Sequence, residues 1–483
     1  MAETAYGEWT SEAGSAGRSA GGRVEGETAP RARAVPEGAP KRQPAREPAA
    51  RTYARALPIV PVRARGLTIE GADGRRYLDC VSGAGTLALG HNHPVVLEAV
   101  RKVLDSGAPL QVVNLTTPVE NAFVTELLHT LPPGLADRAR VRFCGPAGTD
   151  AVTTAVGLVR AATGRDRVIT FTDAHRGAES DESAAPGVRS IRLPHPQDHR
   201  CASGADDERG VELAALRAES VLDDHRPEQE PPAGLIVRPV HGDDGVAPAP
   251  DAWMRRIRRI TAERSVPLIA DETETGVGRT GAFWAVEHSG IIPDVLVLSK
   301  AIGGSLPLAA VVHRDDLHAG DFGAGAFRGN QLALAAGTAT LAHVRAHRLA
   351  EHARALGARM LARLRGLAEE FTCVGDVRGR GLMIGIELVA ADGGHGTGAA
   401  TTAPGRAAPE TAAAVQRECL RRGLIVDRAG PSASVVRLLP PLIITEEQAT
   451  AVLDRLADAV QAVAAAPPPG TGRAPSRRPD APG

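Results

Sequence analysis

The feature that most constrains the fold is an alternation of short apolar runs with helical patterns. Runs rich in Val, Ile and Leu occur at residues 141–144, 168–171, 235–240, 266–270, 295–299 and 308–312. Helical patterns occur at residues 150–162, 252–264, 349–371 and 445–463. Continuous β-branched strands separated by helices are typical of a mostly parallel sheet that is covered on both faces. The sequence therefore predicts an α/β fold.

The two ends of the chain and two internal stretches have a different composition. Residues 1–50 and 467–483 are rich in Pro, Gly and Ala and poor in large apolar side chains, which predicts disorder. The first of these segments has no apolar core of the kind that a secretory signal needs. Residues 179–207 and 391–409 are polar and are predicted to be surface insertions.

Charge and cysteine usage restrict the class of protein. A net charge of -1 and a hydrophobic content of 43% over 483 residues fit a soluble globular protein without a nucleic-acid or membrane partner. The five cysteines show neither metal-ligand spacing nor a disulfide framework, which favours a reducing cytoplasm. Cys144 follows an apolar run and is interpreted as a packed core thiol, not a nucleophile.

Lysine usage draws attention to one residue. Of the 56 basic residues, only Lys41, Lys102 and Lys300 are lysines. Arg cannot replace Lys as an amine nucleophile because its guanidinium stays protonated. Lys41 lies in the N-terminal extension, and Lys102 has the position of a surface charge on an amphipathic helix. Lys300 ends an apolar strand pattern and is followed by a glycine turn, so a chemical role is expected there.

Three motifs together predict a cofactor site. Lys300 can form an imine with an aldehyde, although a lysine at a sheet edge is the alternative reading. Asp271 ends the neighbouring strand pattern and can pair with a protonated ring nitrogen, or simply cap a loop. Gly148 and Thr149 lie between a strand and a helix, where backbone N–H groups can hold a phosphate. Neither dinucleotide-binding nor Walker-type glycine motifs occur in the required context.

These motifs carry a resemblance that covers residues 55–463. The stretches DETETGVGRTG (271–281), LSKAIGG (298–304) and RGRGLMIGIE (378–387) resemble the class III, fold type I pyridoxal-phosphate aminotransferases. Within that family the chain is most similar to the diaminobutyrate–2-oxoglutarate aminotransferases. That similarity is carried by residues 77–94, 143–150, 327–333 and 436–444.

The resemblance implies an architecture and an activity. It implies a homodimer with a large cofactor domain at residues 113–339. A small α+β domain would be built from residues 51–112 and 340–466. The implied reaction moves an amino group from L-2,4-diaminobutyrate, or a similar ω-amine donor, to 2-oxoglutarate. Pyridoxal 5'-phosphate is the implied cofactor, and no metal is expected.

The resemblance also implies roles for single residues. Lys300 would carry the cofactor as a Schiff base and then move a proton at the substrate carbon, and Asp271 would pair with the ring nitrogen. Arg437 would bind a substrate carboxylate, or else form a structural ion pair with Asp243. The remaining expected cofactor contacts are Ala147, Gly148, Thr149, His175, Glu274, Ala326 and Phe327.

Several of these positions depart from the family pattern. The family has hydroxyl residues where this chain has Ala147 and Ala326, and an aromatic residue and His where it has His175 and Arg176. Lost phosphate hydrogen bonds would each cost about 1.5–3 kcal/mol. The family has Glu in place of Arg238 and Gln in place of Glu274. We expect these two residues to form a compensating ion pair.

The departures leave two other functions open. One is a specialised pyridoxal-phosphate enzyme, such as a racemase or a decarboxylase, because the same cofactor supports many reactions. The other is a catalytically impaired aminotransferase that serves as a partner subunit.

Overall fold

A computed structural model describes residues 57–172, 189–196, 207–223, 230–243, 245–317, 328–390 and 407–465. All the helices and strands that are described lie within the unit Ile59–Gly483. The predicted terminal extensions and most of the two predicted insertions fall outside the described residues. The prediction of an insertion at residues 179–207 is wrong for residues 189–194, which form a strand that pairs in parallel with residues 167–172. Among the helices that are described, none has the combination of length and apolarity that a bilayer span requires.

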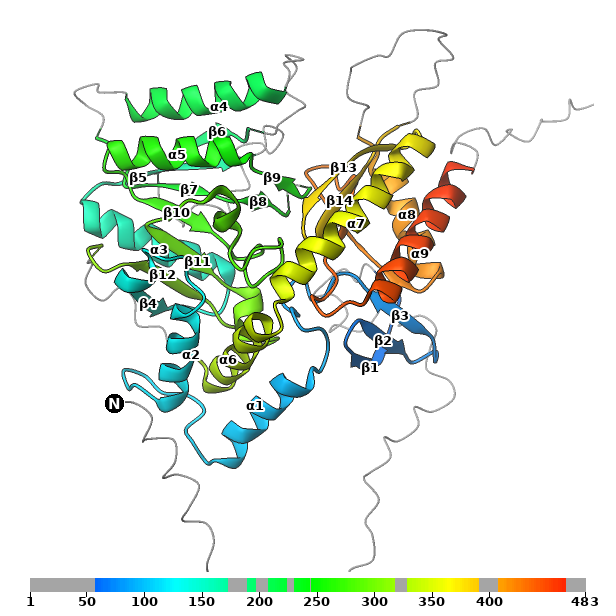
Figure 1. Cartoon of the computed structure of the whole chain (residues 1–483), viewed down its shortest axis with the longest axis horizontal. Coiled ribbons are helices and arrows are strands. Elements are labelled where there is room, and N and C mark those ends of the chain that lie inside the picture. The colour runs from blue at the N-terminus through cyan, green and yellow to red at the C-terminus, as the bar shows by residue number, and fades with distance from the viewer. Residues whose placement is uncertain are drawn as a thin grey trace, which may run out of the picture. The chain divides into compact units, whose positions relative to one another are not determined.

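The largest described sheet of this unit has seven strands (Figure 1). Its order is β4 (Ala139–Phe143), β12 (Ala310–Arg314), β11 (Val295–Leu298), β10 (Leu268–Asp271), β7 (Gly234–Val237), β5 (Arg167–Thr172) and β6 (Arg189–Pro194). Only β12 runs antiparallel to its neighbours, β11 and β4. The remaining pairs are parallel. The predicted α/β fold with a mostly parallel sheet is confirmed.

Alternating side chains of the central strands supply two apolar cores. On β11, Val295 and Val297 belong to a cluster with α3 (Gly148–Thr163). Leu296 and Leu298 belong to the opposite cluster, with α2 (Pro118–Leu128), α5 (Asp251–Glu263) and α6 (Gln331–Ala346). Because successive strand residues point to opposite faces, a sheet covered on both sides needs continuous apolar strands. This requirement explains the unbroken apolar runs in the sequence.

Two smaller sheets contain the chain segments before and after this core. One has the order β1 (Pro61–Arg65), β2 (Thr68–Gly71), β3 (Arg76–Asp79), β15 (Leu424–Ile425). The other has the order β13 (Val374–Arg380), β14 (Met383–Leu388), β17 (Val435–Leu438), β16 (Asp427–Ala429). Because β3 pairs with β15, segments from both predicted parts of the small domain adjoin. The domain boundaries themselves stay a prediction.

The remaining described elements are mainly helices. They are α1 (Pro94–Asp105), η3 (Ala136–Arg138), α4 (Asp207–Leu222), β8 (Val240–His241), β9 (Ala247–Pro248), η4 (Ala285–Ser289), η5 (Lys300–Gly303), α7 (Leu349–Glu370), α8 (Pro409–Arg421) and α9 (Glu446–Ala464). The helix α9 begins after Thr445, whose hydroxyl accepts the Gln448 N–H at 3.2 Å. Its capping sequence is evident before folding.

One apolar run is divided in the structure. The sequence predicts a single strand at residues 235–240, but β7 ends at Val237 and β8 begins at Val240. Pro239 lies between them, and a proline has no N–H to donate to a sheet. The division places Arg238 at the end of β7 with its side chain at a cavity.

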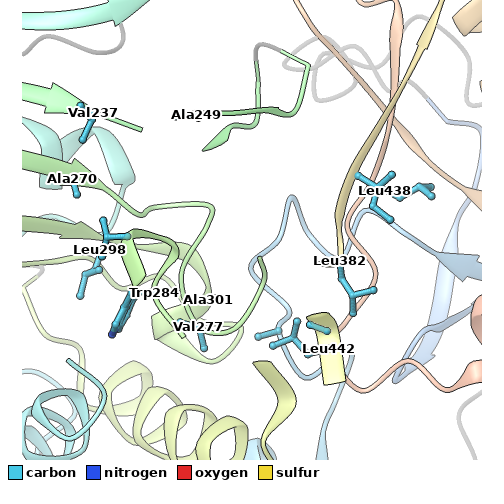
Figure 2. Close-up of a cluster of buried hydrophobic side chains, with 14 of the residues drawn as sticks. Val237, Ala249, Ala270, Val277, Trp284, Leu298, Ala301, Leu382, Leu438 and Leu442 are labelled. Atoms are coloured by element: carbon cyan, nitrogen blue, oxygen red, sulfur yellow. The ribbon is translucent and has the colours of Figure 1, made fainter. Parts of the chain in front are cut away.

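The cluster shared by these sheets supports the turn that carries Lys300. Figure 2 shows Val237, Ala270 and Leu298 on neighbouring strands. Leu382, in the turn between β13 and β14, and Leu438 of β17 belong to the same buried cluster. The turn η5 packs closely on α6. A methyl group on Gly337 would lie 2.2 Å from the Ile302 carbonyl oxygen. The absence of a side chain at Gly337 therefore lets η5 approach the helix.

We predict that Gly337→Ala destabilises the protein by about 1–3 kcal/mol, because the added methyl group would push η5 off α6. Gly366→Ala is the matched control, since Gly366 is also helical but no atom lies within 4 Å of an added methyl group. Ala favours a helix over Gly by about 1 kcal/mol, so the control should be neutral or slightly stabilised. Urea unfolding measures the free energy of unfolding of both variants. An equal loss of stability in Gly337→Ala and Gly366→Ala would show that close packing of η5 on α6 is not the cause.

Candidate active site

The structure brings most of the predicted site residues to one cavity. It has a volume of about 220 Å³. Its lining includes Ala147, Gly148, Thr149, Arg238, Asp243, Asp271, Glu274 and Lys300. The carboxyl ends of β7, β10 and β11 lie beside the start of α3, and this edge of a parallel sheet is where such folds bind ligands.

Lys300 follows the last buried residues of β11. Its backbone φ is +52°, which is uncommon for a residue with a side chain. Its Nζ donates a hydrogen bond to the carboxylate of Glu274. A carbon at Gly242 would overlap that carboxylate, so the glycine gives Glu274 its space. The lysine amine thus lies in the cavity as part of an ion pair.

Asp271 ends the neighbouring strand and is almost fully buried. Its Oδ1 accepts the Thr273 N–H at 3.1 Å, and its Oδ2 accepts from Arg238 Nε at 2.9 Å. The expected pair between Arg238 and Glu274 is wrong for the described residues, because Arg238 binds Asp271 and Glu274 binds Lys300. The reason is strand order: β7 lies next to β10, so the residue after β7 is adjacent to the end of β10.

The start of α3 offers backbone donors to the cavity. Ala147 is its N-cap and provides no side-chain acceptor, while its own N–H donates to Asp150 at 3.1 Å. The N–H groups of Gly148 and Thr149 come first in the helix, where no preceding turn can accept them. Together with the Thr149 hydroxyl and the positive end of the helix dipole, they form an anion-binding arrangement.

Arg437 forms the structural ion pair that was one of the two roles considered for it. It is buried, and its Nη1 lies 3.2 Å from Asp243, the partner expected for a structural ion pair. Its Nη2 also lies 2.7 Å from Asp427, and Glu274 is 3.7 Å from Nη1. Burial alone would lower the pKa of Arg437, but these three carboxylates raise it above its ordinary value. A ligand carboxylate would have to compete with them.

Sequence reasoning missed Asp427 and Glu272. Asp427 lies opposite Arg437 in the β16–β17 pairing, so its role follows from strand register. Glu272 is buried, and its carboxylate accepts from the Thr275 hydroxyl and from Val286 N at 2.8 Å. Burial raises its pKa to about 7. The only signal in the sequence was its position directly after Asp271.

Other predicted residues have different outcomes. His175, Arg176, Ala326 and Phe327 lie outside the described residues. Burial raises the pKa of Cys144 to about 12, which fits a core thiol. Lys102 is an exposed surface charge, as predicted, and lies 2.9 Å from Glu98.

Comparisons with known proteins agree with this geometry. The sequence profile of the class-III aminotransferases matches residues 49–460. The chain is 44% identical to the diaminobutyrate–2-oxoglutarate aminotransferase of Rhizobium meliloti, over 85% of this chain and 90% of that protein. It is 37% identical to the Haemophilus influenzae protein of the same name, over 85% and 92%.

A solved structure supports the same fold. An amine transaminase from an uncultivated Pseudomonas species, in its PLP-bound form, has a TM-score of 0.73 and 26% identity. The match covers 84% of this chain and 95% of that one. The chain belongs to the class III aminotransferases, as its motifs predicted.

The buried Glu272 predicts a specific pH dependence. Its pKa is about 7 in the folded chain, against an ordinary value of 4.5, so the folded state holds a proton that the unfolded state releases. This group's contribution to the free energy of unfolding should therefore fall as pH rises from about 4.5 to about 7, by roughly 3 kcal/mol.

Glu272→Gln removes this titration, so the variant should gain stability relative to the wild type between pH 5 and pH 8. Urea midpoints at the two pH values measure the difference. Glu369→Gln is a suitable control because Glu369 is exposed on α7. If the urea midpoints of the wild type and of Glu272→Gln changed by the same amount between the two pH values, the predicted titration of Glu272 would be refuted.

Proposed function

We propose that this aminotransferase moves the terminal amino group of L-2,4-diaminobutyrate, or of a similar ω-amine donor, to 2-oxoglutarate. The observation that carries the proposal is the meeting of an amine, a buried carboxylate and a helix N-terminus in one cavity. The printed names of the two relatives compared above support the choice of substrates.

The donor set in the cavity fits pyridoxal 5'-phosphate. Lys300 offers an amine for its aldehyde, Asp271 a carboxylate for its ring nitrogen, and the α3 N-terminus N–H donors for its phosphate. When bound, this cofactor supplies an electron sink that stabilises a carbanion at the substrate carbon. The ring-nitrogen partner must be ionised for that purpose, and Asp271 has a cation beside it.

Lys300 has two tasks in this proposal. Its amine would hold the cofactor after giving up a proton, for which the hydrogen-bonded Glu274 carboxylate is an available acceptor. Once free again, Lys300 would move a proton to and from the substrate carbon. Glu274 stays within reach of both Lys300 and Arg437, and can hold the released ammonium between these steps.

Arg437 is the proposed ligand for a substrate carboxylate. Its planar guanidinium suits a bidentate contact, and Asp427 holds one of its nitrogens from the neighbouring strand. Asp243 is half-exposed on the cavity side and is therefore the carboxylate that a ligand can displace at least cost.

We also propose a homodimer that works in the cytoplasm. Leu110, Val113 and Leu115 are 45%, 50% and 66% exposed, and apolar side chains grouped on a surface mark interfaces. The four described cysteines are free and buried, which suits a reducing compartment. Light scattering should give about twice the chain mass of 50.1 kDa, and cell fractionation tests the location.

We predict that the purified chain with added pyridoxal phosphate absorbs between about 330 and 430 nm, as expected for a lysine-bound aldehyde cofactor. Borohydride should fix the label at Lys300, and Lys300→Ala should abolish it, while Lys102→Ala should retain it. With L-2,4-diaminobutyrate and 2-oxoglutarate, the wild type should form glutamate.

Neither of the two alternative functions predicts glutamate formation in this assay. A specialised enzyme with the same cofactor would carry the label at Lys300 but form no glutamate. An impaired partner subunit would form no glutamate even with a range of ω-amine donors. Absence of a label at Lys300 under saturating cofactor would refute the proposal as a whole.

A further inference from the structure

Arg238 occupies a position that is defined by strand register. The parallel strands β7 and β10 pair Val237 with Ala270, so Arg238 and Asp271 leave the sheet side by side. Both line the cavity. Arg238 Nε donates to Asp271 Oδ2 at 2.9 Å, and the arginine side chain is 26% exposed whereas the aspartate side chain is 3% exposed.

The contact gives the aspartate a counter-charge and fixes its direction. A buried carboxylate without a counter-charge costs several kcal/mol, and here the guanidinium supplies that charge. The Thr273 N–H holds the other carboxylate oxygen at 3.1 Å. With one donor on each oxygen, the plane of the carboxylate is fixed from two sides, which leaves the remaining lone pairs for a ligand.

We propose that Arg238 is a positioning residue for the cofactor, which acts through Asp271 and not through the phosphate. It holds the Asp271 carboxylate in the direction that a protonated ring nitrogen requires. This inference rests on the proposed function, because it assumes that pyridoxal phosphate binds in this cavity. It also assigns a role to a position where the family has an acidic residue.

The geometry distinguishes this role from a role at the phosphate. The phosphate donors are at the N-terminus of α3, whereas the Arg238 contact is with the strand-end carboxylate. A residue that acts on Asp271 should affect the binding of pyridoxal and of pyridoxal phosphate equally, since both have the ring nitrogen. A phosphate ligand should affect only pyridoxal phosphate.

The test measures equilibrium dissociation constants of pyridoxal phosphate and of pyridoxal, by absorbance and by quenching of tryptophan fluorescence. The proteins are the wild type, Arg238→Ala, Arg238→Lys, Asp271→Asn and the double variant Arg238→Ala with Asp271→Asn. Arg258→Ala is the matched control. Arg258 is 23% exposed and binds the buried Asp294 at 2.6 Å, a pair of similar burial that does not line the cavity.

We expect Arg238→Ala to raise the dissociation constants of both ligands by the same factor, about tenfold, as for other coupled charge pairs. Arg238→Lys should recover part of the loss because it restores the charge without the planar fork. In the Asp271→Asn background, removal of Arg238 should cause no further loss of affinity for either ligand. Arg258→Ala should leave both affinities unchanged.

Three results would overturn the inference: a loss confined to pyridoxal phosphate, additive losses in the double variant, or an equal loss in Arg258→Ala. In each of these cases the wild type still binds the cofactor, so the proposed function survives. A wild type that binds neither ligand would overturn the proposed function and this inference together.

Discussion

The parallel pairing of β10 with β11 is the interaction on which the site depends. All four residues of each strand are buried, and Asp271 pairs in register with Val297. The pairing therefore brings the carboxylate at the end of one strand near the amine that follows the other. Burial on both faces holds the strands in place, since a shift of register would move apolar side chains out of both cores.

Charged groups near the cavity are held by opposite charges. Lys300 is paired with Glu274, Asp271 with Arg238, and Arg437 with Asp243 and Asp427. Charges that are removed from water need partners, so a folded chain of this kind is stable only if they are matched. Ligand binding in such a site exchanges one ion pair for another, and affinity depends on the difference between the two.

Two of these charged residues, Arg238 and Glu274, differ from the residues that the family has at the same positions. Relative to the family residues, Arg238 exchanges an acidic side chain for a cation, and Glu274 exchanges a neutral amide for an anion. The two changes together move the local charge by one positive unit.

Local sequence patterns were sufficient for most strands of the seven-stranded sheet, the capped helix α9 and the position of Lys300 and Asp271 at strand ends, but not for β6 or for the division between β7 and β8. These features depend on periodicity and on residue chemistry that act over a few neighbours. The α/β class followed from the same patterns, and motif resemblance was sufficient for the family.

Tertiary structure alone decided which charges meet. The sequence could not show that Arg238 would bind Asp271 and leave Glu274 to Lys300, because that choice depends on the order of β7, β10 and β11 in the sheet. Asp427 likewise meets Arg437 only through the pairing of β16 with β17. Ion pairing depends on distances between segments that are far apart in the chain, and only the folded arrangement of the strands sets those distances.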